Sequence, residues 1–230
     1  MPPLGPEEWQ ALALSLRVGA WSVAVSLPLG IALAWLLCRR SFPGKSLVDG
    51  LVHLPLVLPP VVVGYALLVL LGRKGVIGEP LYDLLGITVA FKWQGAAVAS
   101  AVMGFPLMVR AIRLSLEAVD RGLEDAARTL GAGPMSVFLT VTLPLIMPGV
   151  LTGAILSFAR SLGEFGATIT FVSNIPGETR TLPVALYTYT QVPGGDAPAL
   201  RLAAISLVLA LGALLASELL ARRIQVRLGR

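Results

Sequence analysis

The sequence has few charged residues and few side chains that bind metals or form disulfides. Asp, Glu, Lys and Arg make up 13% of its 230 residues, whereas about 25% is typical of soluble domains. A single cysteine and a single histidine exclude an internal disulfide and any site built from several Cys or His ligands. The hydrophobic share of 56% and the mean hydropathy of +0.82 therefore indicate an integral membrane protein.

Signatures of enzymes and of ATP binding are also missing. The sequence contains no Gly-x-Ser-x-Gly elbow, no HExxH motif and no dinucleotide fingerprint. Gly44, Lys45 and Ser46 resemble the end of a phosphate-binding loop, but that loop requires a glycine where the sequence has Arg39. No basic cluster is interleaved with stacking aromatics, which argues against nucleic acid as a partner. What remains is a transmembrane conduit that is not an enzyme and takes its energy from another protein.

Five apolar runs are long enough, or nearly so, to cross a bilayer as helices. A span needs about 20 residues, and the runs cover residues 18–38, 51–71, 93–109, 140–159 and 201–221. Pro55, Pro59 and Pro60 interrupt the second run, which predicts a kink or break that serves either packing or a pathway. The expected fold is an all-α integral membrane protein of about five transmembrane helices, forming a single domain over residues 1–230.

Positive charges predict the orientation of these spans. Three, four and four of the 18 Lys and Arg residues lie in the loop at 39–45, in the segment 110–128 and in the tail after residue 221. Because basic residues favour the cytoplasmic side, we expect the N-terminus outside and the C-terminus in the cytoplasm. Residues 161–195 must then form no additional crossing, although a re-entrant pair of half-helices is compatible with this orientation.

The mostly polar segment between the third and fourth runs predicts a helix that docks against another surface. Its apolar stripe follows the i, i+3, i+4, i+7 pattern of one helical face and consists of Leu123, Ala126, Ala127 and Leu130. Glu124 and Arg128 form an i, i+4 pair on another face. Gly131 suits the position just after a helix, and Pro134 suits the first turn of the next one. We therefore predict a helix, a sharp turn and a second helix.

This segment resembles the EAA loop of binding-protein-dependent ABC importer permeases. The residues that fit the family pattern are Asp125, Ala126, Ala127, Gly131, Val141, Leu143 and Pro144, with Asp125 in place of the usual Glu and Val141 in place of Ile. In the family, this loop is a coupling helix that sits in a cleft of the ATP-binding subunit. The resemblance implies a cytoplasmic coupling segment at 120–144, whose ATPase-coupling residues are Leu123, Glu124, Asp125, Ala126, Ala127, Leu130, Gly131, Leu143 and Pro144.

A second block, Leu-Gly-Glu-Phe-Gly-Ala at 162–167, narrows the resemblance to the oxyanion branch of these permeases. Molybdate or tungstate is the implied cargo, and sulfate permeases are near kin. The small residues suit close helix packing, so packing or gating and contact with the anion remain alternatives. Glu164 would repel a dianion unless Arg160 pairs with it, so direct coordination by Glu164 is not expected. The pathway or gate candidates are Pro59, Pro60, Gly64, Ser161, Gly163, Glu164, Phe165, Gly166 and Thr168.

The resemblance also implies the partners and the location. Two copies of the chain would form the pathway in the bacterial inner membrane, an external oxyanion-binding protein would dock outside, and two cytoplasmic ATP-binding subunits would drive alternating access. ATP and Mg would be bound by those subunits, so no cofactor is expected on this chain. The alternatives are a sulfate or thiosulfate permease and a non-conducting membrane subunit that anchors an ATPase.

Overall fold

The structure is a computed structural model that describes residues 4–227, with side chains to residue 220. Within that part the secondary structure is helical, without strands, which confirms the expected all-α fold. The helices are α1 (Pro6–Arg39), α2 (Lys45–Val57), α3 (Pro60–Leu71), α4 (Gly78–Leu85), α5 (Trp93–Glu117), α6 (Arg121–Thr129), α7 (Pro134–Val137), the π-helical turn η1 (Phe138–Thr142), α8 (Leu143–Leu162), α9 (Gly166–Val172), α10 (Leu182–Thr190) and α11 (Asp196–Arg227).

Four helical segments are long and apolar enough to cross a membrane: α1, α5, the continuous stretch Pro134–Leu162 and α11. The pair α2 and α3 supplies a fifth if it is counted as one broken span. The predicted break lies between them, where the helix axes differ by 117°. A residue before proline is biased away from helical geometry. Leu58 and Pro59 each precede a proline, and both are extended, with ψ of 143° and 132°.

Four of the five predicted spans begin too late in the sequence. The first helix starts at Pro6 rather than residue 18, and the broken second one at Lys45 rather than residue 51. The fourth starts at Pro134 rather than residue 140, and the last at Asp196 rather than residue 201. In α1 the additional turns hold the buried carboxylate of Glu8, whose Oε1 lies 3.0 Å from Nε of Arg201. A buried charge is tolerated when it is paired, and this partner lies 193 residues away.

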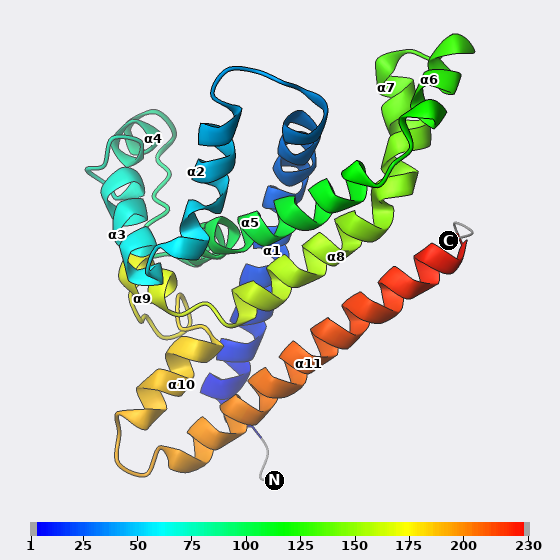
Figure 1. Ribbon diagram of the computed structural model, residues 1–230. Helices are drawn as coiled ribbons and strands as arrows, with labels where there is room; N and C mark the ends of the chain where they lie inside the picture. Colours follow the sequence, from blue (N-terminus) through cyan, green and yellow to red (C-terminus); the bar gives the residue numbers. More distant parts are fainter. Residues whose placement is uncertain (1–3, 228–230) are drawn as a thin grey trace.

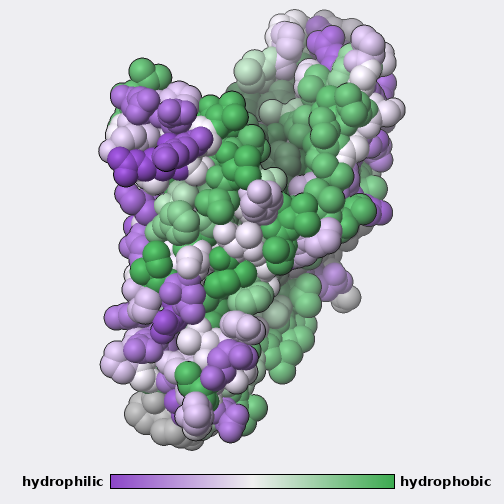
Figure 2. Space-filling model, turned by 90° about the vertical axis from the view of Figure 1, so that its left-hand side faces the viewer, coloured by the Kyte–Doolittle hydropathy of each residue, from purple (hydrophilic) through white to green (hydrophobic). Residues whose placement is uncertain are grey.

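The helices α1, α5 and α8 form the centre of the molecule, and α11 runs along α8 (Figure 1). Small residues allow α5 and α8 to approach closely. A Cβ added to Gly104 would lie 2.4 Å from Oγ of Ser157, and one added to Gly153 would lie 2.9 Å from the carbonyl oxygen of Met108. Figure 2 shows broad hydrophobic areas across the middle of one face, with hydrophilic residues gathered at the ends and along one edge.

The start of α1 and the pair α6 and α7 lie at opposite ends of the molecule. Figure 1 shows α6 and α7 at the end opposite the N-terminus, and α11 runs from the N-terminal end towards the end that carries them. The arginines at 222, 223, 227 and 230, on which the predicted orientation of the tail depends, lie beyond the described side chains.

Candidate functional site

The predicted helix, turn and second helix are confirmed as α6, the residues 130–133 and α7. Asp120 caps α6 by accepting a hydrogen bond from the amide of Gly122, at 2.8 Å. Gly131 has a φ of 87°, which glycine adopts without a Cβ penalty. The amide of Gly131 donates a hydrogen bond to the carbonyl of Arg128, and the amide of Ala132 donates one to the carbonyl of Ala127. This pair of bonds is the Schellman arrangement that ends a helix sharply. Pro134 then opens α7.

Buried ionic and hydrogen bonds hold α6 against the rest of the chain. Oε1 of Glu124 lies 2.8 Å from Nη2 of Arg39 at the end of α1 and accepts a 2.8 Å hydrogen bond from the hydroxyl of Thr142. The side chains of Arg39 and Glu124 are 10% and 7% exposed. The expected pair with Arg128 also forms, but at 3.8 Å it is longer. Sequence reasoning missed Arg39, which lies 85 residues from Glu124.

The apolar stripe of α6 points away from the body of the chain. Leu123 is 48% exposed and Leu130 is 89% exposed, while Ala126 is exposed and Ala127 is half-buried. Asp125 is exposed as well and pairs with Arg128. An outward-facing apolar stripe costs free energy in water, so this geometry suits contact with another protein. Glu124, which we also expected among the coupling residues, is turned inward.

The link from α6 to α8 passes through the π-helical turn. The amide of Leu143 donates to the carbonyl of Phe138, five residues earlier. Pro144, at the start of α8, has no N–H with which to close an α-helical turn. Its presence therefore favours a π-helical turn at this point. Thr142, inside the turn, donates to the carboxylate that holds α6. Leu143 and Pro144, which we expected among the coupling residues, therefore directly follow a contact between α6 and the membrane-spanning part.

The pathway or gate candidates lie around α3 and α9. Glu164 is 2% exposed. Its Oε2 pairs with Nη1 of Arg160 at 2.6 Å, as expected, and its Oε1 accepts a 2.9 Å hydrogen bond from the amide of Ala167. One oxygen thus has an ion-pair partner and the other a hydrogen-bond donor within the chain. Of the remaining candidates in this block, Ser161 and Thr168 are buried, Gly163 ends α8, and Phe165 stacks against Tyr187 with ring centroids 5.1 Å apart.

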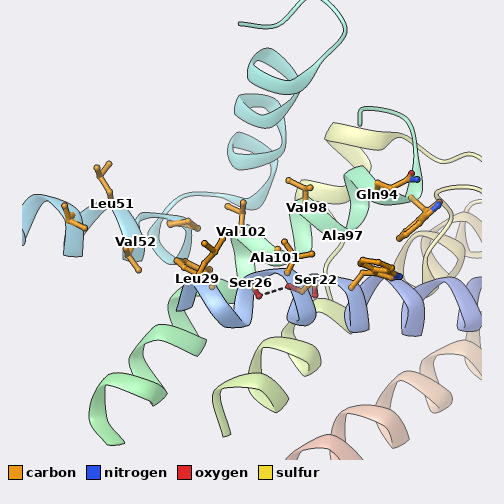
Figure 3. Close-up of a pocket in the computed structure, with 16 residues that line it drawn as sticks. Ser22, Ser26, Leu29, Leu51, Val52, Gln94, Ala97, Val98, Ala101 and Val102 are labelled. Atoms are coloured by element: carbon orange, nitrogen blue, oxygen red, sulfur yellow. Dashed lines mark hydrogen bonds between the residues drawn. The ribbon is translucent and has the colours of Figure 1, made fainter. Parts of the chain in front are cut away.

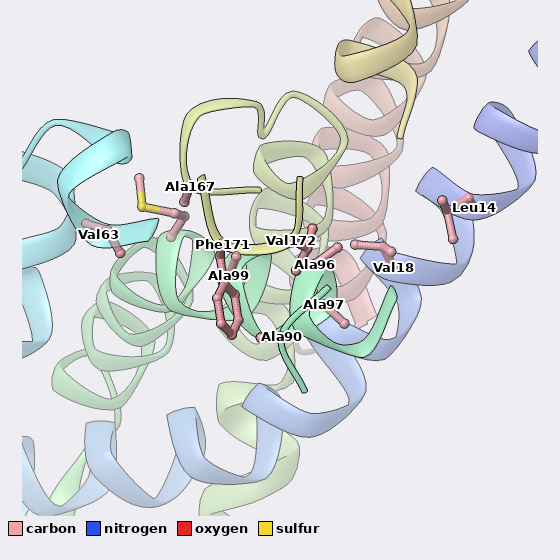
Figure 4. Packing of buried hydrophobic residues seen from close by; sticks show 11 residues of the cluster. Leu14, Val18, Val63, Ala90, Ala96, Ala97, Ala99, Ala167, Phe171 and Val172 are labelled. Carbon is pink, nitrogen blue, oxygen red and sulfur yellow. The ribbon is translucent and has the colours of Figure 1, made fainter. Parts of the chain in front are cut away.

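Two glycines set the distance between α3 and α9. A Cβ added to Gly64 would lie 2.5 Å from the carbonyl oxygen of Ala167, and one added to Gly166 would lie 2.8 Å from Cβ of Pro60. Figure 4 shows Val63 of α3 and Ala167, Phe171 and Val172 of α9 within one buried cluster. The contact between the broken span and the glycine block is therefore tight, and the candidate Pro59 lies at its edge, immediately before α3.

The two groups of candidate residues are separate and are joined by α8. The π-helical turn precedes its first residue, and Ser161 and Gly163 lie at its last turn. A helix of 20 residues is about 30 Å long. The helix α8 thus connects the segment that contains α6 to the residues that lead into α9.

A groove between α1, α2 and α5 has a volume of about 830 Å³. Figure 3 shows its largely apolar lining, with Leu29, Val52 and Val98 among the labelled side chains. The hydroxyls of Ser22 and Ser26 donate to carbonyls of their own helix, those of Gly19 and Ser22, at 2.8 and 2.6 Å. An oxyanion needs donors or cations in exchange for its hydration shell, so this groove is unsuited to one.

The helical fold is one found in solved ABC transporters. The fold is shared with chains in the crystal structures of a bacterial alginate ABC transporter (TM-score 0.74, 20% identity, 96% of this chain and 80% of that one) and of the methionine ABC transporter MetNI (TM-score 0.67, 19% identity, 94% of both). Within this class, the chain belongs to the family of binding-protein-dependent transport system inner membrane components, which residues 26–226 match. It is a multi-pass protein of the inner membrane.

The similar proteins within this family include permeases of molybdenum and sulfate transport systems. The chain is 66% identical over 223 residues to the molybdenum transport system permease protein ModB of Escherichia coli K12, covering 97% of both chains. It is 58% identical to ModB of Haemophilus influenzae, over 96% of this chain and 97% of that one. The sulfate transport system permease protein CysW of Synechococcus elongatus is 40% identical, over 86% of this chain and 70% of that one.

Proposed function

We propose that the chain is the permease subunit of an ABC importer that moves molybdate inward. The observation that carries this proposal is the 66% identity to a molybdenum permease along 97% of both chains. The chain itself is a permease without its own ATPase site, so the energy comes from a separate subunit. The lower identity to a sulfate permease, at 40%, makes sulfate the less favoured cargo. Tungstate, an oxyanion of the same shape and charge, is an expected competitor.

The mechanism we infer is alternating access by a pair of identical chains. Each chain is one permease domain over residues 1–230, with its N-terminus outside and its C-terminus in the cytoplasm. The apolar groove in Figure 3 offers an oxyanion few polar partners, so it is not the pathway that we propose. An external oxyanion-binding protein delivers the anion, and two ATP-binding subunits act from the cytoplasm through residues 120–144.

The proposed docking surface is the outward stripe of α6, formed by Leu123, Ala126, Ala127 and Leu130. Replacing Leu123 and Leu130 with serine should weaken binding of the ATPase subunit at least tenfold, since burial of each leucine contributes about 1.5–3 kcal/mol. Thermal unfolding of the chain alone should not change, because both side chains are exposed. Affinity is measured by titrating the purified chain with the ATPase subunit.

An equivalent pair of exposed leucines provides the control. Leu84 and Leu85, at the end of α4, are 81% and 66% exposed, and serine at both positions should leave ATPase binding unchanged. If the two double variants bind the ATPase subunit equally well, α6 is not the docking surface.

Uptake of labelled molybdate into proteoliposomes tests the cargo. With the ATPase subunit inside, and the binding protein and molybdate outside, accumulation should require ATP. Unlabelled tungstate should compete far more strongly than sulfate. Equal competition by sulfate would favour the sulfate-permease alternative, and ATP hydrolysis without any accumulation would favour a non-conducting anchor for an ATPase.

A further inference from the structure

A polar cavity of about 340 Å³ lies between the C-terminal end of α1 and the segment from α6 to η1. Four arginines and two acids line it: Arg39, Arg40, Arg121, Arg128, Glu124 and Asp125. The cavity is on the inward side of α6, away from the apolar stripe, because the inward-turned Glu124 is part of its wall. It is therefore distinct from the proposed docking surface.

The charges of this cavity do not balance. Glu124 pairs with Arg39 at 2.8 Å, and Asp125 pairs with Arg128 at 2.5 Å. Among the described side chains, Arg40 and Arg121 form no ion pair with a carboxylate, and the guanidinium of Arg40 lies 5.7 Å from the centre of the Trp35 ring. Four cations against two anions leave a formal surplus of two positive charges, which is the charge that a dianion would neutralise.

Two further features point to an anion. Arg121 is the first residue of α6, at the positive end of the helix dipole, where a cation is unfavourable and an anion is stabilised. Its own helix therefore gives no reason for an arginine there. Arg39 has a side chain that is 10% exposed, and its Nε is buried without a hydrogen-bond partner among the described atoms. A buried donor without an acceptor costs free energy, so the wall of this cavity is incompletely satisfied.

We propose that this cavity binds an oxyanion of the phosphate class, held by Arg40 and Arg121 with Arg39 behind them. Guanidinium groups suit such a ligand because their planar forks donate two parallel hydrogen bonds to neighbouring oxygens. An anion here would connect the loop after α1 to the first turn of α6. It would thereby tie the coupling segment to the first membrane span. The site goes beyond the proposed transport function, and a chain that moved no molybdate would still show the binding.

The phosphate group has two possible sources, a free anion and the headgroup of an anionic lipid, and two arms of one experiment separate them. In the first arm, the full chain in phosphatidylcholine nanodiscs is titrated with inorganic phosphate by calorimetry. In the second, the chain is reconstituted with phosphatidylglycerol, and native mass spectrometry counts the lipids retained as the lipid fraction is raised. Saturable binding in the first arm identifies a free oxyanion, and in the second a lipid phosphate.

The decisive variant is the double exchange Arg40→Gln and Arg121→Gln. Both side chains are exposed, so folding should be preserved. The dissociation constant should rise at least tenfold, because the variant removes the charge-assisted hydrogen bonds of both guanidinium groups. Exchanging both arginines for lysine retains the two positive charges but removes the planar guanidinium groups, and affinity for the anion should fall less than in the glutamine variant.

The control is Lys74→Gln with Lys92→Gln, which removes the same charge from exposed positions outside the cavity. It should change the dissociation constant less than twofold. The proposal would be overturned if neither arm showed saturable binding. The proposal would also be overturned if the Arg40→Gln and Arg121→Gln double variant bound as well as the unmodified chain. The same holds if this variant and the Lys74→Gln and Lys92→Gln control weakened binding equally. Loss of molybdate uptake with oxyanion binding intact would instead contradict the proposed transport function alone.

Discussion

Replacing Arg39 with glutamine is expected to destabilise the chain by about 3–5 kcal/mol, because it leaves Glu124 as a buried carboxylate without its closest cation. The effect should be concentrated in α6, which the pair fastens to the end of α1. Hydrogen exchange of the α6 amides should accelerate strongly. In the reconstituted transporter, stimulation of ATP hydrolysis by the binding protein should largely disappear. Thermal unfolding, hydrogen exchange and ATPase rate provide the three measurements.

Two variants separate the loss of the pair from a general loss of charge. Arg128→Gln removes a cation that is 52% exposed and 3.8 Å from Glu124, and exposed pairs contribute about 0–1 kcal/mol, so its effect should be small. Exchanging both Arg39 and Glu124 for glutamine removes the unpaired buried charge and should recover most of the stability. If Arg39→Gln proved no worse than Arg128→Gln, the buried pair would not be what holds α6.

Gly64→Ala is expected to disrupt the contact between α3 and α9. The new methyl group would lie 2.5 Å from the carbonyl oxygen and 2.8 Å from Cα of Ala167, and backbone atoms cannot turn aside as a side chain can. Overpacking of this kind typically costs about 1–3 kcal/mol. For a chain of this length, each kcal/mol lowers the melting temperature by about 2–4 °C. Molybdate uptake should fall together with the melting temperature if the contact between α3 and α9 is part of the gate.

Gly163→Ala is the matched control for this prediction. It adds the same methyl group in the neighbouring glycine block, but the nearest atom to the added Cβ is 3.9 Å away. Gly163 also has a φ of −95°, which alanine adopts readily. Its melting temperature should match that of the unmodified chain. Equal losses in both variants would mean that alanine acts through something other than the α3–α9 contact.

Local chemistry made much of this structure predictable. The break before Pro60 follows from steric restriction of the residues that precede proline, and the turn at Gly131 from a backbone conformation that glycine adopts easily. The pair between Arg160 and Glu164 follows from their i, i+4 spacing. The stripe on α6 was likewise predictable, since helical periodicity fixes which residues share a face.

Contacts between distant segments were not predictable from a single sequence. Nothing near Glu124 in the chain identifies Arg39 as its main partner, and nothing near Glu8 identifies Arg201. The uncharged apolar run placed the start of the first span at residue 18, whereas the helix begins at Pro6 and its Glu8 is paired with Arg201. The approach of Gly64 to Ala167 likewise depends on the packing of α3 against α9.

The central claim is that ATP hydrolysis in a separate subunit drives molybdate through this permease by way of the α6 stripe. The most direct measurement is the amount of molybdate accumulated per ATP hydrolysed, in proteoliposomes that contain the chain, the ATPase subunit and the binding protein. We predict accumulation only when all three are present. The Leu123→Ser and Leu130→Ser double variant should lose both accumulation and the stimulated hydrolysis. Accumulation without the ATPase subunit, or full coupling in the double variant, would contradict the claim.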